Sequence, residues 1–327
     1  MKPNYQNNEA ARWFQMITEN PSQIPFFFTY RGENYTGFSN DKMTLLSREN
    51  CKTNEKENVT LRFKVDDTLE ATVLCTFYQA YGAAEWTVWF ENTGNENSGI
   101  LENPHTEMLF SGEKPVLKGI YGDAVNQYRP YAFELDRESA HFISDIGRAT
   151  HINFPYFNLE YGDRGVMLAI GWAGTWEANF HQTDAGVLYS GRSAINLKTY
   201  LKPGEKIRTA LYLAAFYTVR DENYATNYWR NWFIHCSMPK ADKTGAEIEP
   251  FSTTCFADDT GRLNSDGSIS EGFDTWKPTM DKILEEKIPI NFRWFDAGWY
   301  IAPDLGSADP GTADCVKTHC KLHLNMV

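Results

Sequence analysis

Short alternating runs of apolar and polar residues dominate the first two-thirds of the chain. They are clearest in VTLRFKVDDTLEATVLCTFYQAYGAAEWTVWFEN at 59–92, and they continue through RGVMLAIGWAGTWEANFHQ at 164–182 and the segment 185–217. Turn signals separate the runs, including Asn92-Thr-Gly-Asn95 and the Pro-Gly pair of LKPGEKI. A period of two with such punctuation predicts antiparallel β-strands.

The number of predicted strands bears on the architecture. The pattern predicts short strands throughout about two hundred residues, from 20 to 220. This is more strands than one flat sheet would hold, so we predict a single large β-sandwich. A helix is expected before it, because Ala10, Trp13, Phe14 and Ile17 recur at helical spacing.

A different pattern begins after Asn223. Tyr224, Tyr228, Trp229 and Trp232 are spaced as one face of a helix, and the polar segment KADKTGAEIEP follows. We therefore predict three regions: a β-supersandwich with a helical exit at 1–238, a linker at 239–250, and a second domain at 251–327.

The second domain is predicted to begin with a strand–helix–strand unit. FSTTCFA at 251–257 indicates a short strand, TWKPTMDKILEEK an amphipathic helix, and IPINFRWFDAGW at 288–299 a second strand. The helix is expected to place Met280, Ile283 and Leu284 on one face. Two parallel strands cannot cover their own faces, so this unit is expected to be part of something larger.

Composition and charge narrow the possible partners and location. The chain has 31 basic and 43 acidic residues, a net charge of −12 and no cluster of five or more basic residues, which argues against a nucleic-acid partner. It has no run of eighteen apolar residues and no visible signal peptide, so we predict no membrane span and a cytoplasmic location. The six cysteines are scattered and are expected to be reduced.

Candidate chemistry lies in WFDAGWY at 294–300. Asp296 follows an apolar strand directly, and Trp299 is three residues further on. A carboxylate at a strand end can accept hydrogen bonds from sugar hydroxyls, and an indole face can pack against a pyranose ring. The alternative is that Asp296 caps a helix and Trp299 is ordinary packing.

This segment resembles the DAGWY region of α-galactosidases of glycoside hydrolase family 36. Other segments resemble the same family in the same order: PFFFTYRGENYTGF at 25–38, VMLAIGWAGTWEANF at 166–180, 201–217, and NYWRNWF at 227–233. The likeness covers residues 12 to about 303. It implies a mainly β fold, with a large β-supersandwich followed by the first βαβ part of a (β/α)₈ barrel.

The resemblance also implies a function, which is removal of terminal α-linked galactose with retention of configuration. Asp296 and Trp299 would be substrate-binding residues for galactose-containing oligosaccharides, and a full-length family member could be homo-oligomeric. The family's two catalytic carboxylates lie on later barrel strands, so no catalytic residue is assigned here, and the chain is expected to be inactive. Asp258 and Asp259 match the family poorly and are interpreted as solvated loop acids.

After residue 303 the likeness fades, and we interpret the tail as the product of a truncation or frameshift. Cys315, His319, Cys320 and His323 lie in this tail, but their C-x₃-H-C-x₂-H spacing departs from zinc motifs. No metal or cofactor is predicted.

Two other functions remain open from the sequence. The sandwich could be a non-catalytic module for carbohydrate binding or assembly. It could also be a mutarotase-like epimerase, which would need a histidine–acid pair; His151 and His181 are available, but neither is coupled to a particular acid. Trp172 and Trp176 could face a sugar, although core packing or a domain interface is the interpretation we favour.

Overall fold

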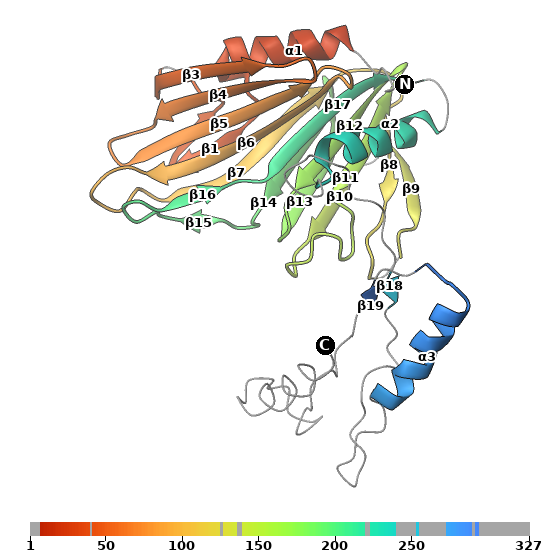
Figure 1. Cartoon of the computed structure of the whole chain (residues 1–327). Helices are drawn as coiled ribbons and strands as arrows, with labels where there is room; N and C mark the ends of the chain where they lie inside the picture. The colour runs from red at the N-terminus through yellow and green to blue at the C-terminus, as the bar shows by residue number, and fades with distance from the viewer. Residues whose placement is uncertain are drawn as a thin grey trace. The chain divides into compact units, whose positions relative to one another are not determined.

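The structure is a computed structural model of the chain, and its description covers residues 7–39, 41–124, 127–135, 139–219, 223–239, 253–254, 273–289 and 292–293 (Figure 1). The chain divides into two compact units, Met1–Met238 and Pro239–Val327, and each is described by itself.

The first unit opens with the predicted helix, α1 (Asn8–Glu19), followed by the 3₁₀ turn η1 (Pro21–Gln23). The side chain of Asn7 caps α1 by accepting hydrogen bonds from the backbone N–H groups of Glu9 and Ala10. Ala10, Phe14 and Ile17 are buried, and the Phe14 ring stacks on Phe77 with centroids 5.2 Å apart. The apolar stripe in the sequence is therefore the packed face of the helix.

One layer of the unit is a seven-stranded antiparallel sheet in the order β10-β13-β14-β7-β1-β2, with β15 paired to β7. Its strands are β1 (Phe27–Tyr30), β2 (Glu33–Thr36), β7 (Leu101–Phe110), β10 (Ala140–Ser144), β13 (Trp176–Thr183), β14 (Gly186–Ser193) and β15 (Lys198–Thr199).

The other layer is a ten-stranded antiparallel sheet in the order β3-β4-β5-β6-β17-β12-β11-β8-β9, with β16 paired to β6. Its strands are β3 (Thr44–Lys52), β4 (Lys56–Lys64), β5 (Leu69–Tyr78), β6 (Ala83–Asn92), β8 (Val116–Ile120), β9 (Pro130–Glu134), β11 (Tyr156–Tyr161), β12 (Arg164–Gly171), β16 (Lys206–Arg208) and β17 (Leu211–Thr218). The sequence prediction of a large β-sandwich between 20 and 220 is thus confirmed.

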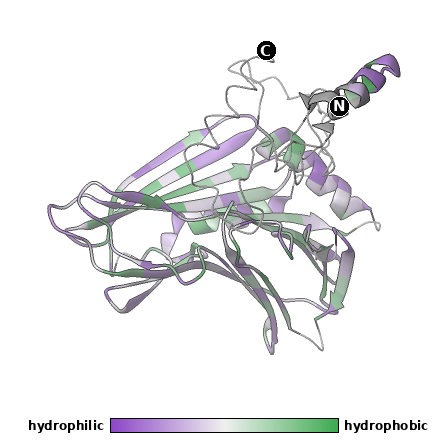
Figure 2. Cartoon of the chain, turned by 90° about the horizontal axis from the view of Figure 1, so that it is seen from below, coloured by the Kyte–Doolittle hydropathy of each residue, from purple (hydrophilic) through white to green (hydrophobic). Residues whose placement is uncertain are grey.

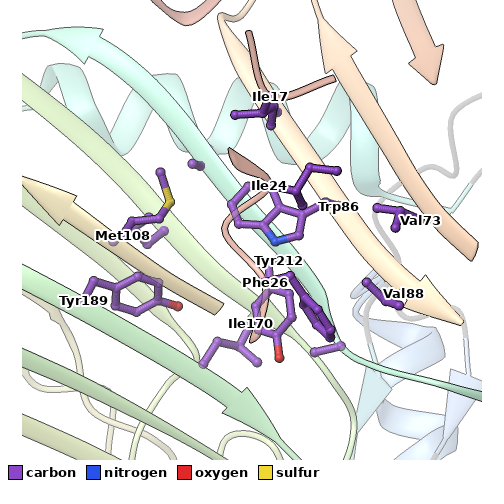
Figure 3. Close-up of a cluster of buried hydrophobic side chains, with 14 of the residues drawn as sticks. Ile17, Ile24, Phe26, Val73, Trp86, Val88, Met108, Ile170, Tyr189 and Tyr212 are labelled. Carbon is purple, nitrogen blue, oxygen red and sulfur yellow. The ribbon is translucent and has the colours of Figure 1, made fainter. Parts of the chain in front are cut away.

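The main core lies between the two sheets. Figure 3 shows Ile24, Phe26, Trp86, Met108 and Tyr189 converging there from both layers. In Figure 2 the hydrophobic and hydrophilic colours alternate along many strands, as expected when every second side chain faces a core.

A second core lies on the opposite face of the ten-stranded sheet. The helix α2 (Tyr224–Trp232) buries Ala225, Tyr228 and Trp232, and the π-helical turn η2 (Phe233–Ser237) continues from it. These residues pack on Met167, Leu213 and Ala215, together with other side chains that point away from the main core. Strands β12 and β17 are therefore buried on both faces, which explains their nearly continuous apolar sequences.

The second unit contains β18 (Thr253–Thr254), α3 (Phe273–Glu285) and β19 (Phe292–Arg293). β18 and β19 pair in parallel, as predicted for a strand–helix–strand unit. A barrel is not evident among the described residues. The predicted helix face is only partly correct, because Ile283 is buried but Leu284 is 70% exposed. In the described part of the chain, no helix is both long and apolar enough to cross a membrane.

Candidate functional site

The residues predicted to bind sugar, Asp296 and Trp299, lie outside the described residues. The same is true of Asp258, Asp259 and the four Cys and His residues of the tail. The two substrate-binding assignments therefore remain predictions. Chemistry can be built from the described residues only in the first unit.

A cleft of about 430 Å³ opens at the amino end of α1. Three stretches that are distant in the sequence line it: the first turns of α1, the β11–β12 turn, and the end of β17 with the start of α2. Its lining residues are Asn7, Asn8, Glu9, Ala10, Trp13, Tyr161, Asp163, Arg164, Gly165, Phe216, Tyr217, Thr218 and Tyr224. No single sequence motif could have indicated this site, because hairpin and helix packing assemble it.

The floor of the cleft is aromatic. Trp13 and Phe216 are each partly exposed, and their ring centroids are 5.4 Å apart at an interplanar angle of 59°. Trp13 also meets Trp86 edge to face at 5.9 Å, which anchors it on the main core. The two rings are therefore held in fixed positions by packing.

The rim of the cleft is charged. Arg164 Nη1 donates to Glu9 Oε1 across 3.0 Å, which ties the start of β12 to the start of α1. Asp163 lies beside Arg164 in the tight β11–β12 turn, where Gly162 has a φ of +62° that suits glycine. The carboxylate of Asp163 has no hydrogen-bond partner among the described residues and is exposed to solvent.

Tyr217 forms part of the wall, and its hydroxyl is engaged beneath the cleft. The hydroxyl donates to Asn158 Oδ1 at 2.6 Å and lies 3.2 Å from Glu160 Oε1. The other oxygen of Glu160 accepts from Lys118 Nζ at 2.6 Å. Burial, with the nearby Glu160 carboxylate, raises the pKa of Tyr217 well above its usual range. The hydroxyl therefore stays a neutral hydrogen-bond donor.

Glu85 is a buried acid on β6, on the sheet face that carries the second core. It is 8% exposed, and Tyr78 Oη donates to its Oε2 at 3.0 Å. Burial raises the pKa of Glu85 to about 7, against the lowering effect of the Tyr78 hydrogen bond. Such a carboxyl group could exchange a proton near neutral pH, but it does not line the cleft.

The two tryptophans of GWAGTWE have structural positions. Trp176 is fully buried in the main core and donates from Nε1 to the Ala149 carbonyl at 2.6 Å. Trp172 is partly buried against the same core, with the Arg208 guanidinium 5.9 Å from its ring centroid. The interpretation as core residues is therefore correct for Trp176, and neither residue lines the cleft.

The two histidines named from the sequence have different neighbours. His151 Nδ1 lies 3.8 Å from Asp123 Oδ1, whereas His181 Nδ1 is 2.8 Å from Ser139 Oγ. Among the described residues the closest histidine–acid contact is one that the sequence does not indicate: His141 Nε2 is 2.9 Å from Glu177 Oε1.

Glu177 Oε2 also accepts from Arg192 Nε at 2.6 Å. The positive charge of Arg192 and these hydrogen bonds outweigh the effect of burial and hold the pKa of Glu177 below its usual range. His141, Glu177 and Arg192 lie on the outer face of the seven-stranded sheet. On β13 the alternate positions Trp176, Ala178 and Phe180 face the core instead. Only the β10–β13 register reveals the pair.

Comparison with known proteins gives a result at the level of structure only. No protein-family model matches this sequence, and no curated protein matches it.

Solved structures share the fold. An α-galactosidase of glycoside hydrolase family 36 from Geobacillus stearothermophilus, in complex with 1-deoxygalactonojirimycin, has a TM-score of 0.60 at 15% identity, covering 88% of this chain and 41% of that one. The α-galactosidase from Lactobacillus brevis has a TM-score of 0.60 at 12% identity, with 92% and 42% covered. Other structures of the Geobacillus enzyme hold raffinose or stachyose.

This chain spans only about two-fifths of those structures, 41% and 42%. The identities are too low to carry activity across, so the likeness concerns the fold. That likeness agrees with the order of motifs found in the sequence. The chain therefore has the fold of the corresponding part of the family 36 α-galactosidases.

Proposed function

We propose that this chain corresponds to the front portion of a retaining α-galactosidase-like glycoside hydrolase that acts on terminal α-linked galactose. The observation that carries the proposal is the fold likeness to family 36 α-galactosidases over 88% and 92% of the chain. The WFDAGWY motif supports it, because the motif comes directly after the parallel pair of β18 and β19 in sequence.

In this proposal Asp296 and Trp299 form one side of the galactose site. A carboxylate accepts hydrogen bonds from vicinal hydroxyls, and the indole packs on the apolar face of the ring. Galactose-containing oligosaccharides are the expected substrates of the whole enzyme.

The 327-residue polypeptide itself is proposed to lack turnover. A retaining glycosidase needs two carboxyl groups about 5 to 5.5 Å apart, one as nucleophile and one as acid/base. The resemblance assigns both to strands beyond those matched here. Asp296 alone binds and cannot complete the two-step reaction.

A chromogenic α-galactoside assay tests this point. We expect the purified chain to release no product above the rate of a buffer blank. Turnover that disappears in Asp296→Ala would contradict the proposal, because both catalytic groups would then have to lie within these residues. A release rate that persists in Asp296→Ala would indicate a contaminating enzyme, and repurification would have to remove it.

The alternative function is a non-catalytic carbohydrate-binding or assembly module. The aromatic cleft of the first unit favours it, because the described residues that line the cleft all come from the sandwich and its helices. The two functions differ in where a sugar binds, which can be measured residue by residue.

A further inference from the structure

We propose that the cleft at the amino end of α1 is a binding site for a neutral saccharide. The proposal stands on residues of the first unit and does not depend on Asp296 or Trp299. It assigns a ligand to a feature that the proposed hydrolase function leaves unused.

The floor of the cleft provides the apolar half of a sugar site. A pyranose presents C–H groups on its faces, and these pack well on aromatic rings. Trp13 and Phe216 are partly exposed, and packing on the main core fixes them, with Trp13 locked against Trp86 at 5.9 Å. Because these rings are already ordered, a ligand would not have to immobilise them on binding.

The rim provides the polar half of the site. Asp163 offers carboxylate oxygens that have no partner among the described residues, and these can accept hydrogen bonds from two hydroxyls. Glu9 and Arg164 hold each other at 3.0 Å, so both are oriented at the edge of the cleft. Hydrogen bonds to charged groups are stronger than those between neutral groups, which favours a ligand with many hydroxyls.

The charges of the rim disfavour anionic ligands. Among the described residues, two acids, Glu9 and Asp163, face one cation, Arg164, so a phosphate or carboxylate would meet net negative charge. An organic cation would be attracted by Asp163 but repelled by the Arg164 guanidinium. A neutral polyol can donate hydrogen bonds to the acids and accept them from Arg164.

The size of the cleft agrees with a saccharide. Its volume of about 430 Å³ lies in the range of small-molecule sites, which is about 300 to 1,000 Å³. Gly165 packs closely against the wall of the cleft: a Cβ added at this position would lie 2.1 Å from the Tyr217 ring. The close packing of Gly165 keeps the wall in place.

Fluorine NMR of the full chain labelled with 5-fluorotryptophan tests the proposal site by site. The chain has ten tryptophans, so single Trp→Phe variants can assign the Trp13 and Trp299 resonances. Raffinose is the probe, and tetramethylammonium and inorganic phosphate are the ionic comparisons. We expect raffinose to shift the Trp13 resonance saturably and the two ions to leave it unchanged.

Asp163→Ala should raise the dissociation constant for raffinose, measured from the Trp13 resonance, by about tenfold. This corresponds to the loss of about 1.4 kcal/mol for one charge-assisted hydrogen bond. Asp184→Ala is the matched control, because Asp184 is exposed in the β13–β14 turn and does not line the cleft. Both positions are exposed turn residues, so folding should survive in both variants.

Three results would overturn the proposal: an unmoved Trp13 resonance at saturating raffinose, an equal response to either ion, or an Asp163→Ala variant that behaves like Asp184→Ala. A Trp299 shift without a Trp13 shift would also reject this site while supporting the proposed hydrolase function. A Trp13 shift without a Trp299 shift would support the site in the cleft and not the galactose site at Asp296.

Discussion

The two cores on either side of the ten-stranded sheet differ in chemistry. The core between the sheets is almost entirely apolar and aromatic, with Trp176, Phe157 and Phe180 fully buried. The core beneath α2 also contains aromatic residues, but buried polar groups such as Glu85 and Asn158 lie on the same sheet face.

The difference follows from how each face is covered. The inner face is covered by another sheet, so most positions that face the core between the two sheets are apolar, and the few small polar residues there, such as Thr106 and Ser193, are buried. Among the described residues, the outer face is covered in part by α2 and η2, so polar residues of an otherwise solvent-facing surface are enclosed and bonded to one another. The first core should therefore be sensitive to lost volume, and the second to lost hydrogen bonds and to pH.

The largest expected effect is in the first core. Trp176→Ala should lower the free energy of unfolding by about 3 to 5 kcal/mol, because it removes a fully buried ring and leaves a cavity. Chemical denaturation measures it. Trp172→Ala is the control and should lose less than half as much, since Trp172 is only partly buried. Equal losses of unfolding free energy would contradict the expectation that the more deeply buried Trp176 contributes more to stability.

The second expected effect is a pH dependence that comes from Glu85. Its pKa in the folded state is about 7, above its ordinary value of 4.5, so the folded protein binds the extra proton between these values. Stability should then fall as pH rises from about 4.5 to about 7, by roughly 2 to 3 kcal/mol.

Glu85→Gln should abolish this slope and be the more stable form at pH 8. Denaturation midpoints at pH 5 and pH 8 decide the matter. Glu91→Gln, on the same strand with a half-exposed side chain that is paired with Lys206, serves as the control and should leave the slope unchanged. A slope that survives Glu85→Gln would assign the pH dependence to another group.

A smaller effect is expected from the hydroxyl of Tyr217. Tyr217→Phe leaves Asn158 Oδ1, which accepts at 2.6 Å, without that donor, and should cost about 1 to 3 kcal/mol of stability. Tyr200→Phe provides the comparison, because Tyr200 is 44% exposed. An unchanged free energy of unfolding in Tyr217→Phe would show that water replaces the lost donor.

The smallest effect concerns the solvated part of the same face. Arg62 and Glu70 form an ion pair at 2.7 Å between β4 and β5, and the Arg62 side chain is 49% exposed. Arg62→Gln should leave the denaturation midpoint unchanged within error, because exposed pairs contribute little. A clear loss would place the polar half of the sheet among the structurally important regions.

The sandwich and α1 could be predicted because both depend on local patterns. Alternation along β5 and the Ala10–Phe14–Ile17 spacing correspond directly to buried faces. The burial of Glu85 could not be predicted, because β6 by itself places that residue on its polar face. Its enclosure depends on Tyr78 of the neighbouring strand β5, which itself packs against the second core with Trp232 of α2.

The cleft and the pairing of His141 with Glu177 have the same origin. Each depends on strand register and on segments far apart in the chain, which single-sequence patterns do not specify. The candidate roles of Asp296 and Trp299 rest instead on a local motif and a family resemblance. Both residues lie outside the described residues, so their roles are still predictions.

A galactose titration of the 5-fluorotryptophan-labelled chain tests the central claim most directly. We expect a weak, saturable shift of the Trp299 resonance with galactose, a smaller one with glucose, and loss of the galactose effect in Asp296→Ala. Weak affinity is expected because exposed hydrogen bonds exchange for water at little net gain. A Trp299 resonance that galactose leaves unmoved, or that responds equally in Asp296→Ala, would contradict the assignment of this segment to a galactose site.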